Sequence, residues 1–400
     1  MLTVAIISEY NPFHKGHAYQ IECIRKDFGA DTAVISIMSG NYTQRGEIAF
    51  MPKTERAKCA ILGGSNLVLE IPFPFSSTSA EIFAKSGIKI AESLGIVDYI
   101  SFGSESGDID ALYKVAKTYL SPEFKAEFAK LSDAQAIGFP ARCELAYKAV
   151  AGECSIDFTP NNILAIEYIK TLIETGSKIK AHTVKRVGAA YGTEDIEDGS
   201  NQSAMAIRRA FLSSNPSDTL EYVPESSRKV IEDTMLAGDL PTDISKISSA
   251  VISKLRLNPS TLNEDYHDAG DGLYNRLCNM SFEANDIQTL LKLSETKNYT
   301  RARIRRALLN VFFGVTSSDV KALPRYTQVL GMDSVGMKIL KKVKKSDFRI
   351  LTKPSAFDDF GKIEREQKTI SDKADSIFEL TKPIPKHGKS ALTFTPFIKK

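Results

Sequence analysis

The sequence lacks the features that mark secreted, membrane-spanning and zinc-binding proteins. No window approaches the roughly 18 apolar residues that a membrane span needs. The first apolar run ends at Glu9, after about seven residues, too few for the core of a signal peptide. The five cysteines are scattered, with no CxxC pair and no metal-ligand spacing, at Cys23, Cys59, Cys143, Cys154 and Cys278. This usage argues against a zinc site or a disulfide framework, so we expect a protein of the reducing cytoplasm.

An excess of charge of one sign is also missing. The formal net charge is only +3 over 400 residues, so a basic surface can arise only from local clustering. An apolar fraction of 42% with 25% charged residues is ordinary for a soluble globular protein. The length exceeds what one hydrophobic core usually serves, so the length by itself predicts two or three domains.

Short apolar runs alternate with longer helical patterns through about the first half of the chain, which is typical of a parallel sheet with crossover helices. We predict strands at residues 2–8, 32–38, 67–71, 97–102 and 180–184. We predict helices at 17–28, from Pro52 to the glycines at 63 and 64, at 80–94 and at 161–175. The expected fold class is α/β, a Rossmann-like, doubly wound parallel sheet.

The strand signal fades after about residue 213. Helical patterns follow at 228–237, 244–255, 271–279, 287–293 and 301–313. Four prolines and mixed charge in the last fifty residues indicate short elements and loops. The sequence therefore predicts a first domain at 1–213 and a mainly helical domain at 214–400.

Histidine is scarce as well, yet two of the five histidines stand in His14-Lys15-Gly16-His17, directly after the first predicted strand. In an open parallel sheet, ligands bind beyond the carboxyl ends of the strands. A helix that begins near Gly16 would direct its first amide groups and its positive dipole end into that crevice, where they suit phosphate oxygens. His14 and His17 are three residues apart and can share one helical face. Gly16 leaves the backbone bare, so a nucleotide can approach closely.

The spacing therefore predicts contacts to the phosphates of a nucleoside triphosphate. The competing interpretation is that the two histidines are plain helix caps or solvated surface residues. Their place directly after the first strand favours phosphate binding.

The HxGH motif resembles that of the superfamily that contains nucleotidyltransferases and class I aminoacyl-tRNA synthetases. Further runs make the chain similar to the tRNA(Met) cytidine acetate ligase family. These are EYNPFHKGHAYQI at 9–21, MSGNYTQRGEIAFMPKTERAKCAI at 38–61, LEIPFPFSSTSAEIFAKSGIKI at 69–90, FGSES at 102–106, TPNNILAIEYIK at 159–170, KRVGAAY at 185–191 and KNYTRARIRRALLNVFFGV at 297–315.

The resemblance implies a HIGH-type nucleotidyltransferase fold and an ATP-dependent ligase. Such an enzyme activates acetate as acetyladenylate, releases pyrophosphate, and acetylates N4 of the wobble cytidine of elongator tRNA(Met) to give N4-acetylcytidine. ATP, acetate and elongator tRNA(Met) are then its substrates, and Mg²⁺ is expected as the companion of ATP.

The resemblance also implies the roles of particular residues. His14 and His17 become the catalytic phosphate contacts. The ATP-binding residues implied are Ile7, Ser8, Glu9, Tyr10, Asn11, Pro12, Phe13, His14, Lys15, Gly16, His17, Ala18, Tyr19, Gln20, Gly103, Asn161, Arg186 and Arg208.

Each of the later residues has a simpler interpretation beside this one. Gly103 fits a turn, Asn161 fits a helix cap, and Arg186 fits a solvated charge. The family motif favours Asn161 over Asn162 as the nucleotide contact.

A second phosphate motif of the superfamily, ISSTxxR, is similar to the run from Ser203 to Arg208. Arg208 matches the final arginine and would meet pyrophosphate bidentately. Met205 stands where threonine is usual, so a hydroxyl contact is missing.

The loop after the second predicted strand contains Thr43-Gln44-Arg45-Gly46, which fits a lid or a tRNA contact and equally a mobile surface loop. Glu9 and Glu70 follow two other strands and are candidates to bind magnesium with ATP. No other metal site is predicted.

Residues 297–349 contain thirteen Lys or Arg against three Asp. A charge run is usually a solvated face, but this excess persists and is interleaved with aromatic residues, as expected for contact with a phosphate backbone. The residues expected to bind tRNA are Arg301, Arg303, Arg305 and Arg306.

Two other functions fit part of the pattern. A coenzyme adenylyltransferase would explain HxGH but leaves the basic helical half without a task. A non-catalytic RNA-binding protein that senses nucleotide would not need His14, Gly16, His17 and Arg208 together.

Overall fold

A computed structural model describes residues 1–131, 139–186, 202–213, 219–257, 265–343, 347–353, 360–393 and 395–399. Three features of the sequence analysis are affected by these gaps. The predicted domain boundary after residue 213 adjoins a segment outside the described residues. Most of the KRVGAAY run, and Lys344 and Lys345 of the basic stretch, lie outside them.

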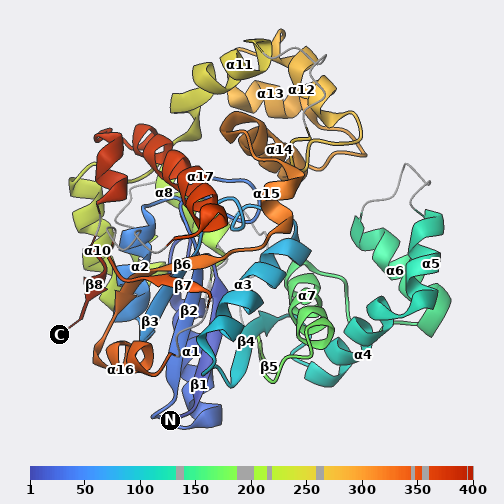
Figure 1. The fold of residues 1–400 in the computed structure, drawn as a ribbon, viewed down its shortest axis with the longest axis vertical. Coiled ribbons are helices and arrows are strands. Elements are labelled where there is room, and N and C mark those ends of the chain that lie inside the picture. Colours follow the sequence, from blue (N-terminus) through green and yellow to red (C-terminus); the bar gives the residue numbers. More distant parts are fainter. Residues whose placement is uncertain are drawn as a thin grey trace.

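The described residues form one eight-stranded, mostly parallel sheet (Figure 1). Its strand order is β5-β4-β1-β2-β3-β6-β7, and β8 pairs with β6. The parallel part confirms the predicted α/β class. The strands are β1 (Thr3–Ser8), β2 (Ala33–Ser39), β3 (Leu67–Ile71), β4 (Tyr99–Ser104), β5 (Lys180–Lys185), β6 (Tyr326–Met332), β7 (Arg349–Leu351) and β8 (Phe397–Ile398).

The strand order reverses beside β1. From β1 the chain moves outward to β2 and β3, then returns to place β4 on the other side of β1 and β5 beyond it. The loops after β1 and β4 therefore separate at the carboxyl ends of these strands and leave a crevice there.

Alternate residues of β1 face opposite cores. Ala5 and Ile7 pack with one set of helices, and Val4 and Ile6 pack with another. The first set includes α3 (Ala80–Leu94), α4 (Ile109–Leu120) and α7 (Pro160–Glu174), and the second includes α1 (Lys15–Phe28), α2 (Lys53–Leu62) and α10 (Glu225–Leu236). Both faces of the sheet are covered, as a doubly wound sheet requires.

Four further helices form a core of their own. Helices α11 (Ser248–Leu257), α12 (Leu273–Ser281), α13 (Ile287–Ser294) and α14 (Arg301–Phe313) share their own buried cluster and stand away from the sheet (Figure 1). Of the other helices, α5 (Pro122–Lys130), α6 (Phe139–Ala151) and α16 (Ser334–Lys342) pack with the first core, and α8 (Ala204–Ser213) packs with the second. Helices α15 (Ser317–Lys321) and α17 (Lys362–Phe378) contribute to a smaller buried cluster.

Strand β6 and helix α17 are among the elements of the second half that were not predicted. Strand β6 enters the sheet antiparallel to β3, so the chain beyond residue 213 is helical only in part. Helix α17 has 17 residues, where the prediction of short elements and loops was wrong. The inward face of α17 includes Gln367, Lys368, Ser371 and Asp375, so few apolar residues mark this helix in the sequence.

Candidate nucleotide-binding site

A cavity of about 220 Å³ opens where the strand order reverses. It lies at the carboxyl ends of β1, β4 and β5, as predicted for a ligand crevice in such a sheet. The predicted ATP-binding residues that line it are Ile7, Ser8, Glu9, Tyr10, Asn11, His14, Gly16, His17, Tyr19, Gln20, Gly103, Asn161, Arg186 and Arg208.

Four residues of the predicted segment are not part of the cavity wall: Pro12, Phe13, Lys15 and Ala18. Phe13 is fully buried, and its ring lies so close to Gly63 that a Cβ atom at that glycine would be 2.3 Å from it. Lys15 is exposed. A continuous motif is thus divided by the turn into residues that face the cavity and residues that support it.

Both histidines of the motif are fixed through Nδ1. His14 is the N-cap of α1, and its Nδ1 accepts from the Gly16 amide at 3.1 Å. His17 Nδ1 accepts from the His14 amide at 3.2 Å. Since an accepting nitrogen of a neutral imidazole has no proton, the proton lies on Nε2 in both rings. Each ring can therefore donate one hydrogen bond from Nε2.

The surroundings keep both rings neutral. Their centroids are 3.7 Å apart in a stacked arrangement. Burial, with Arg186 and Arg208 nearby, lowers the pKa of His14 to about 3. Burial, His14 and Arg186 hold the pKa of His17 well below its usual range. The helix-cap interpretation is correct for His14, but the cap also orients a neutral donor at the cavity.

Gly16 is required by the packing of this cap. A Cβ atom at Gly16 would lie 3.0 Å from His14 Cε1 and 3.1 Å from Nδ1. The ring of His14 thus rests against the bare first turn of α1, which is the close approach that glycine permits.

Acid stability offers a test of the neutral His14. The unfolded chain binds a proton below the ordinary histidine pKa of 6.5, whereas folded His14 does so only near pH 3. Folding stability should therefore fall as pH decreases between these values, by about 2 kcal/mol at pH 5. Urea denaturation of the ligand-free protein and of His14→Gln at both pH 7.5 and pH 5 measures this. The glutamine variant should lose about 2 kcal/mol less on acidification, and equal losses would contradict a neutral His14.

Arg186 lies across Gly103 at the ends of β4 and β5. Its amide donates to Ser104 O at 3.0 Å, and its Cγ would be 3.3 Å from a Cβ atom at Gly103. Both residues line the cavity. The bare backbone of Gly103 leaves room for the arginine side chain, a role that a plain turn glycine would not have.

The structure distinguishes the two neighbouring asparagines. Asn161 lines the cavity, and its Nδ2 donates to Glu105 Oε1 at 2.6 Å. Asn162 is buried, and its Oδ1 accepts from the amides of Glu105 and Ser106 in the turn after β4. Asn162 therefore shapes the turn, and Asn161 is the one placed to meet a ligand.

The first turn of α8 brings a second helix N-terminus to the cavity. Ser203, Met205 and Arg208 all line it. Ser203 Oγ accepts from the Ala206 amide at 3.0 Å and thus caps the helix. Arg208 donates to Asn11 O at 2.8 Å and to Glu47 Oε2 at 3.1 Å. The arginine joins this helix to the HxGH loop and to the loop after β2.

The loop after β2 forms one wall of the cavity. Thr43, Gln44, Arg45 and Glu47 line it, and Gly46 does not. The Gln44 amide donates to Glu9 Oε1 at 2.8 Å, and Gln44 Nε2 donates to Thr78 O at 2.9 Å. Burial raises the pKa of the Glu9 carboxyl. The loop is thus part of the site in the described structure.

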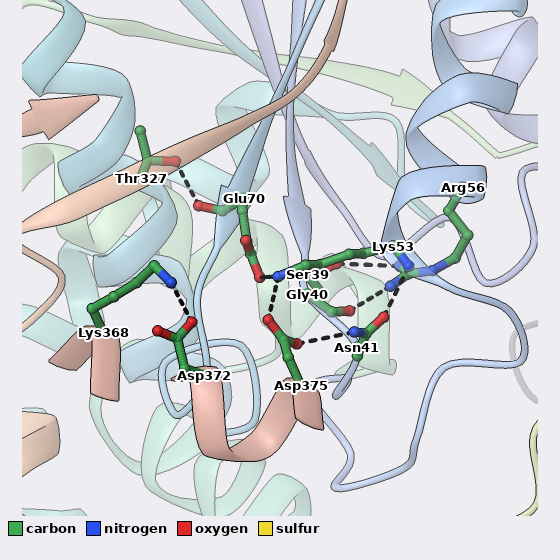
Figure 2. Close-up of polar contacts among 10 residues, drawn as sticks. All are labelled: Ser39, Gly40, Asn41, Lys53, Arg56, Glu70, Thr327, Lys368, Asp372 and Asp375. Carbon is green, nitrogen blue, oxygen red and sulfur yellow. Dashed lines mark hydrogen bonds and ion pairs between the residues drawn. The ribbon is translucent and has the colours of Figure 1, made fainter. Parts of the chain in front are cut away.

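Glu70 is not available as the predicted magnesium ligand. Its side chain is buried and is not part of the cavity wall. Its Oε1 lies 2.7 Å from Lys53 Nζ (Figure 2). Lys53 Nζ also lies 2.6 Å from Asp375 Oδ2 of α17. Among the described residues, no cluster of three or more His, Cys, Asp or Glu has a metal-binding arrangement. Glu9 is the candidate that still faces the cavity.

This buried network fixes both ends of the loop after β2. Asp375 Oδ1 accepts from Asn41 Nδ2 at 2.9 Å, and Asn41 Oδ1 accepts from the Lys53 amide at 2.9 Å (Figure 2). Arg56 is fully buried and donates to the carbonyls of Glu9, Ser39, Gly40 and Met51. The sequence analysis missed this network because its partners are more than three hundred residues apart.

The predicted basic surface is not one continuous face. Figure 1 places α14 at one end of the molecule and α16 near the N-terminus at the other. The residue before α16, Asp333, pairs with Asn66, which precedes β3, so this helix lies at the edge opposite the cavity. Within the described part of the basic stretch, α14 reaches the site, because its Arg305 pairs with Glu47 of the cavity wall.

The four arginines of α14 also differ in their surroundings. Arg306 is nearly buried and bonds Asp268 Oδ2 at 2.6 Å, and Arg303 bonds Asp271 Oδ2 at 2.8 Å. Arg305 pairs with Glu47. Arg301 is exposed and donates a hydrogen bond to Gln288 Oε1 at 3.1 Å. Arg303 and Arg306 thus support the fold of the loop before α12, and Arg301 is the most accessible cation of the four.

A mostly parallel α/β sheet, a crevice beside β1 and an HxGH turn at a helix N-terminus define a nucleotidyltransferase. The profile of the family described as HIGH Nucleotidyl Transferase matches residues 1–391. The chain belongs to this family and, by its identity to curated relatives, to the tRNA(Met) cytidine acetate ligases within it.

The curated tRNA(Met) cytidine acetate ligase of Thermoanaerobacter sp. (strain X514) is 35% identical over 361 residues, which cover 88% of this chain and 89% of that protein. The ligase of the same name from Caldicellulosiruptor saccharolyticus is 37% identical over 348 residues, 86% of this chain and 85% of that protein. The crystal structure of Thermotoga maritima TmcAL bound with alpha-thio ATP is similar over 100% of both chains, with a TM-score of 0.90 and 27% identity.

Proposed function

We propose that this protein is an ATP-dependent ligase that acetylates N4 of the wobble cytidine of elongator tRNA(Met). The observation that carries the proposal is the cavity beside β1. Two neutral histidines, two helix N-termini and two arginines line this one cavity. The relatives named tRNA(Met) cytidine acetate ligase and the neighbour bound with alpha-thio ATP support it.

The first step suits donors rather than a nucleophilic side chain. An acetate oxygen would attack the α-phosphorus of ATP, forming acetyladenylate as the bond to pyrophosphate breaks. Negative charge grows on the phosphate oxygens in this displacement, and fixed hydrogen-bond donors stabilise it. Nε2 of His14 and His17 and the guanidinium groups of Arg186 and Arg208 are such donors.

In the second step the cytidine N4 would attack the acetyl carbon. The new N–C bond forms as the bond to the phosphate oxygen breaks, AMP leaves, and the nitrogen loses a proton. Mg²⁺ would arrive with ATP, because it binds mainly phosphate oxygens and water with one or two carboxylates. Glu9 is the carboxylate of the cavity wall that fits this need, since Glu47 is paired with Arg208 and Arg305.

A direct test is mass spectrometry of tRNA(Met) after incubation with the protein, ATP and isotope-labelled acetate. The labelled acetyl group should appear on one cytidine, and pyrophosphate release should require acetate. Release that depends on another acid or on a phosphorylated metabolite would favour a small-molecule adenylyltransferase instead.

We further propose that residues 1–213 supply the ATP-binding part of the protein and that the helices beyond residue 214 bind tRNA. Strand β6 of this second part returns to the sheet of the first.

In the described part of the chain no helix is long and apolar enough to cross a membrane. All five cysteines lie in the described part of the chain, and none of them forms a disulfide. A cytoplasmic tRNA-modifying enzyme accords with both findings.

The accessible cation on α14 gives a prediction about RNA binding. Arg301→Gln should weaken tRNA binding and reduce the slope of log affinity against log salt by about one, because one phosphate contact and its released counterion are lost. Binding is measured by fluorescence anisotropy over a range of salt concentrations. The matched control is Lys341→Gln on α16, which should leave the slope unchanged. The reverse result would move the RNA surface to the other end of the molecule.

A further inference from the structure

A second cavity of about 200 Å³ adjoins the first. Its floor is apolar and includes the buried side chains of Ile287, Leu291 and Leu308. Its polar lining includes Glu47, Thr242, Asp243, Gln288 and Arg305. An apolar floor with a few polar groups at the edge is the usual make-up of a site for a small, flat ligand.

Glu47 borders both cavities. Its Oε2 accepts from Arg208 at 3.1 Å on the nucleotide side, and its Oε1 pairs with Arg305 on the side of the second cavity. The preceding residue, Gly46, has a φ of +73° and packs directly on α14, where a Cβ atom would be 2.6 Å from the Arg306 amide nitrogen. The carboxylate therefore lies on the short turn that separates the two cavities.

We propose that the second cavity binds the cytosine that accepts the acetyl group, with Glu47 and Arg305 reading its Watson–Crick edge. Cytosine presents a donor at N4 next to acceptors at N3 and O2. A carboxylate has about four acceptor positions and guanidinium is only a donor, so Glu47 can accept from N4 while Arg305 donates to N3 or O2. This proposal rests on the function proposed above and adds to it the residues that select the base.

The same arrangement explains discrimination between pyrimidines. Uracil presents a carbonyl oxygen in place of the N4 amine, and that oxygen would face the Glu47 carboxylate without a proton between them. Because Glu47 also borders the nucleotide cavity, a cytosine bound to it presents N4 at the boundary where acetyladenylate would form.

The test is equilibrium binding of two anticodon stem-loop RNAs of tRNA(Met), with cytidine or uridine at the wobble position, in the absence of ATP and acetate. The wild-type protein should prefer the cytidine RNA. Glu47→Gln can donate as well as accept and should reduce that preference by about tenfold. Arg305→Met should reduce it similarly, whereas Lys292→Met, an exposed cation on neighbouring α13, should lower affinity for both RNAs equally.

Acetate-dependent ATP–pyrophosphate exchange and thermal unfolding are measured on the same preparations. Loss of preference in folded variants supports the proposal whatever their exchange rate, because the binding assay contains no nucleotide. An unchanged preference in both Glu47→Gln and Arg305→Met, or a wild-type protein that binds both RNAs equally, would overturn the subsite. Absence of exchange and of acetylation in the wild-type protein would instead count against the proposed ligase activity.

Discussion

His14→Ala and His17→Ala should each slow acetate-dependent ATP–pyrophosphate exchange by about 100- to 1000-fold, the usual cost of removing one donor that stabilises transition-state charge. Each substitution removes an Nε2 donor whose direction is fixed by a backbone hydrogen bond to Nδ1. Because both pKa values lie far below 7, the exchange rate should also show no inflection near pH 6.5 from these residues.

The expected loss lies in the chemistry rather than in RNA binding. The two rings line the nucleotide cavity at the end of β1, whereas the exposed Arg301 of α14 is not part of the cavity wall. Affinity for tRNA should therefore change little. His182→Ala is the matched control, since His182 bonds Asp27 and Ser101 and is not part of the cavity wall. Equal loss of tRNA binding and exchange in the two cavity variants would contradict this division of roles.

Lys53→Met should lower the free energy of unfolding by about 3–5 kcal/mol, because it leaves two carboxylates buried without their cation. The side chains of Lys53, Glu70 and Asp375 are only 4%, 2% and 6% exposed. Burial by itself would lower the pKa of Lys53, but Asp375 and Glu70 hold it above its usual range, so the lysine is charged. Urea denaturation measures the loss.

Lys85→Met is a close control for this substitution. Lys85 also lies near two carboxylates, Glu81 at 2.6 Å and Glu174 at 3.5 Å, but on the surface. Surface ion pairs contribute about 0–1 kcal/mol, so this variant should be nearly as stable as the wild type. Asp375→Ala should fall between the two, since Lys53 keeps its contact with Glu70. Similar stability of the Lys53 and Lys85 variants would mean that the buried network is dispensable.

Local patterns predicted much of the fold. Strand β3 and helices α3 and α14 have the predicted bounds, and the other strands of the parallel sheet lie within two residues of theirs. These elements bury apolar residues at the spacing of a strand or a helix, so their periodicity is visible in the sequence. Strand β6 escaped prediction because Thr327, Gln328 and Gly331 interrupt its apolar run, although all seven of its residues are buried. Helix α17 escaped because much of its inward face is polar.

Most of the candidate site was also predictable, since it depends on the end of one strand and the start of the next helix. The sequence favoured Asn161 over Asn162 only through the family motif, because the physical difference depends on which side chain the turn after β4 needs. Nor could it show that Glu70 pairs with Lys53, or that α14 and α16 lie at opposite ends of the molecule.

By itself, the sequence determined the parallel sheet, the HxGH turn after β1 and the family, because each depends on residues close together in the chain. Only the tertiary structure decided which residues of the motif face the cavity, that Asp375 of α17 fixes the loop after β2, and that Glu47 stands between Arg208 and Arg305. Those contacts join residues far apart in the chain. Their energies depend on burial and distance, which no local pattern encodes.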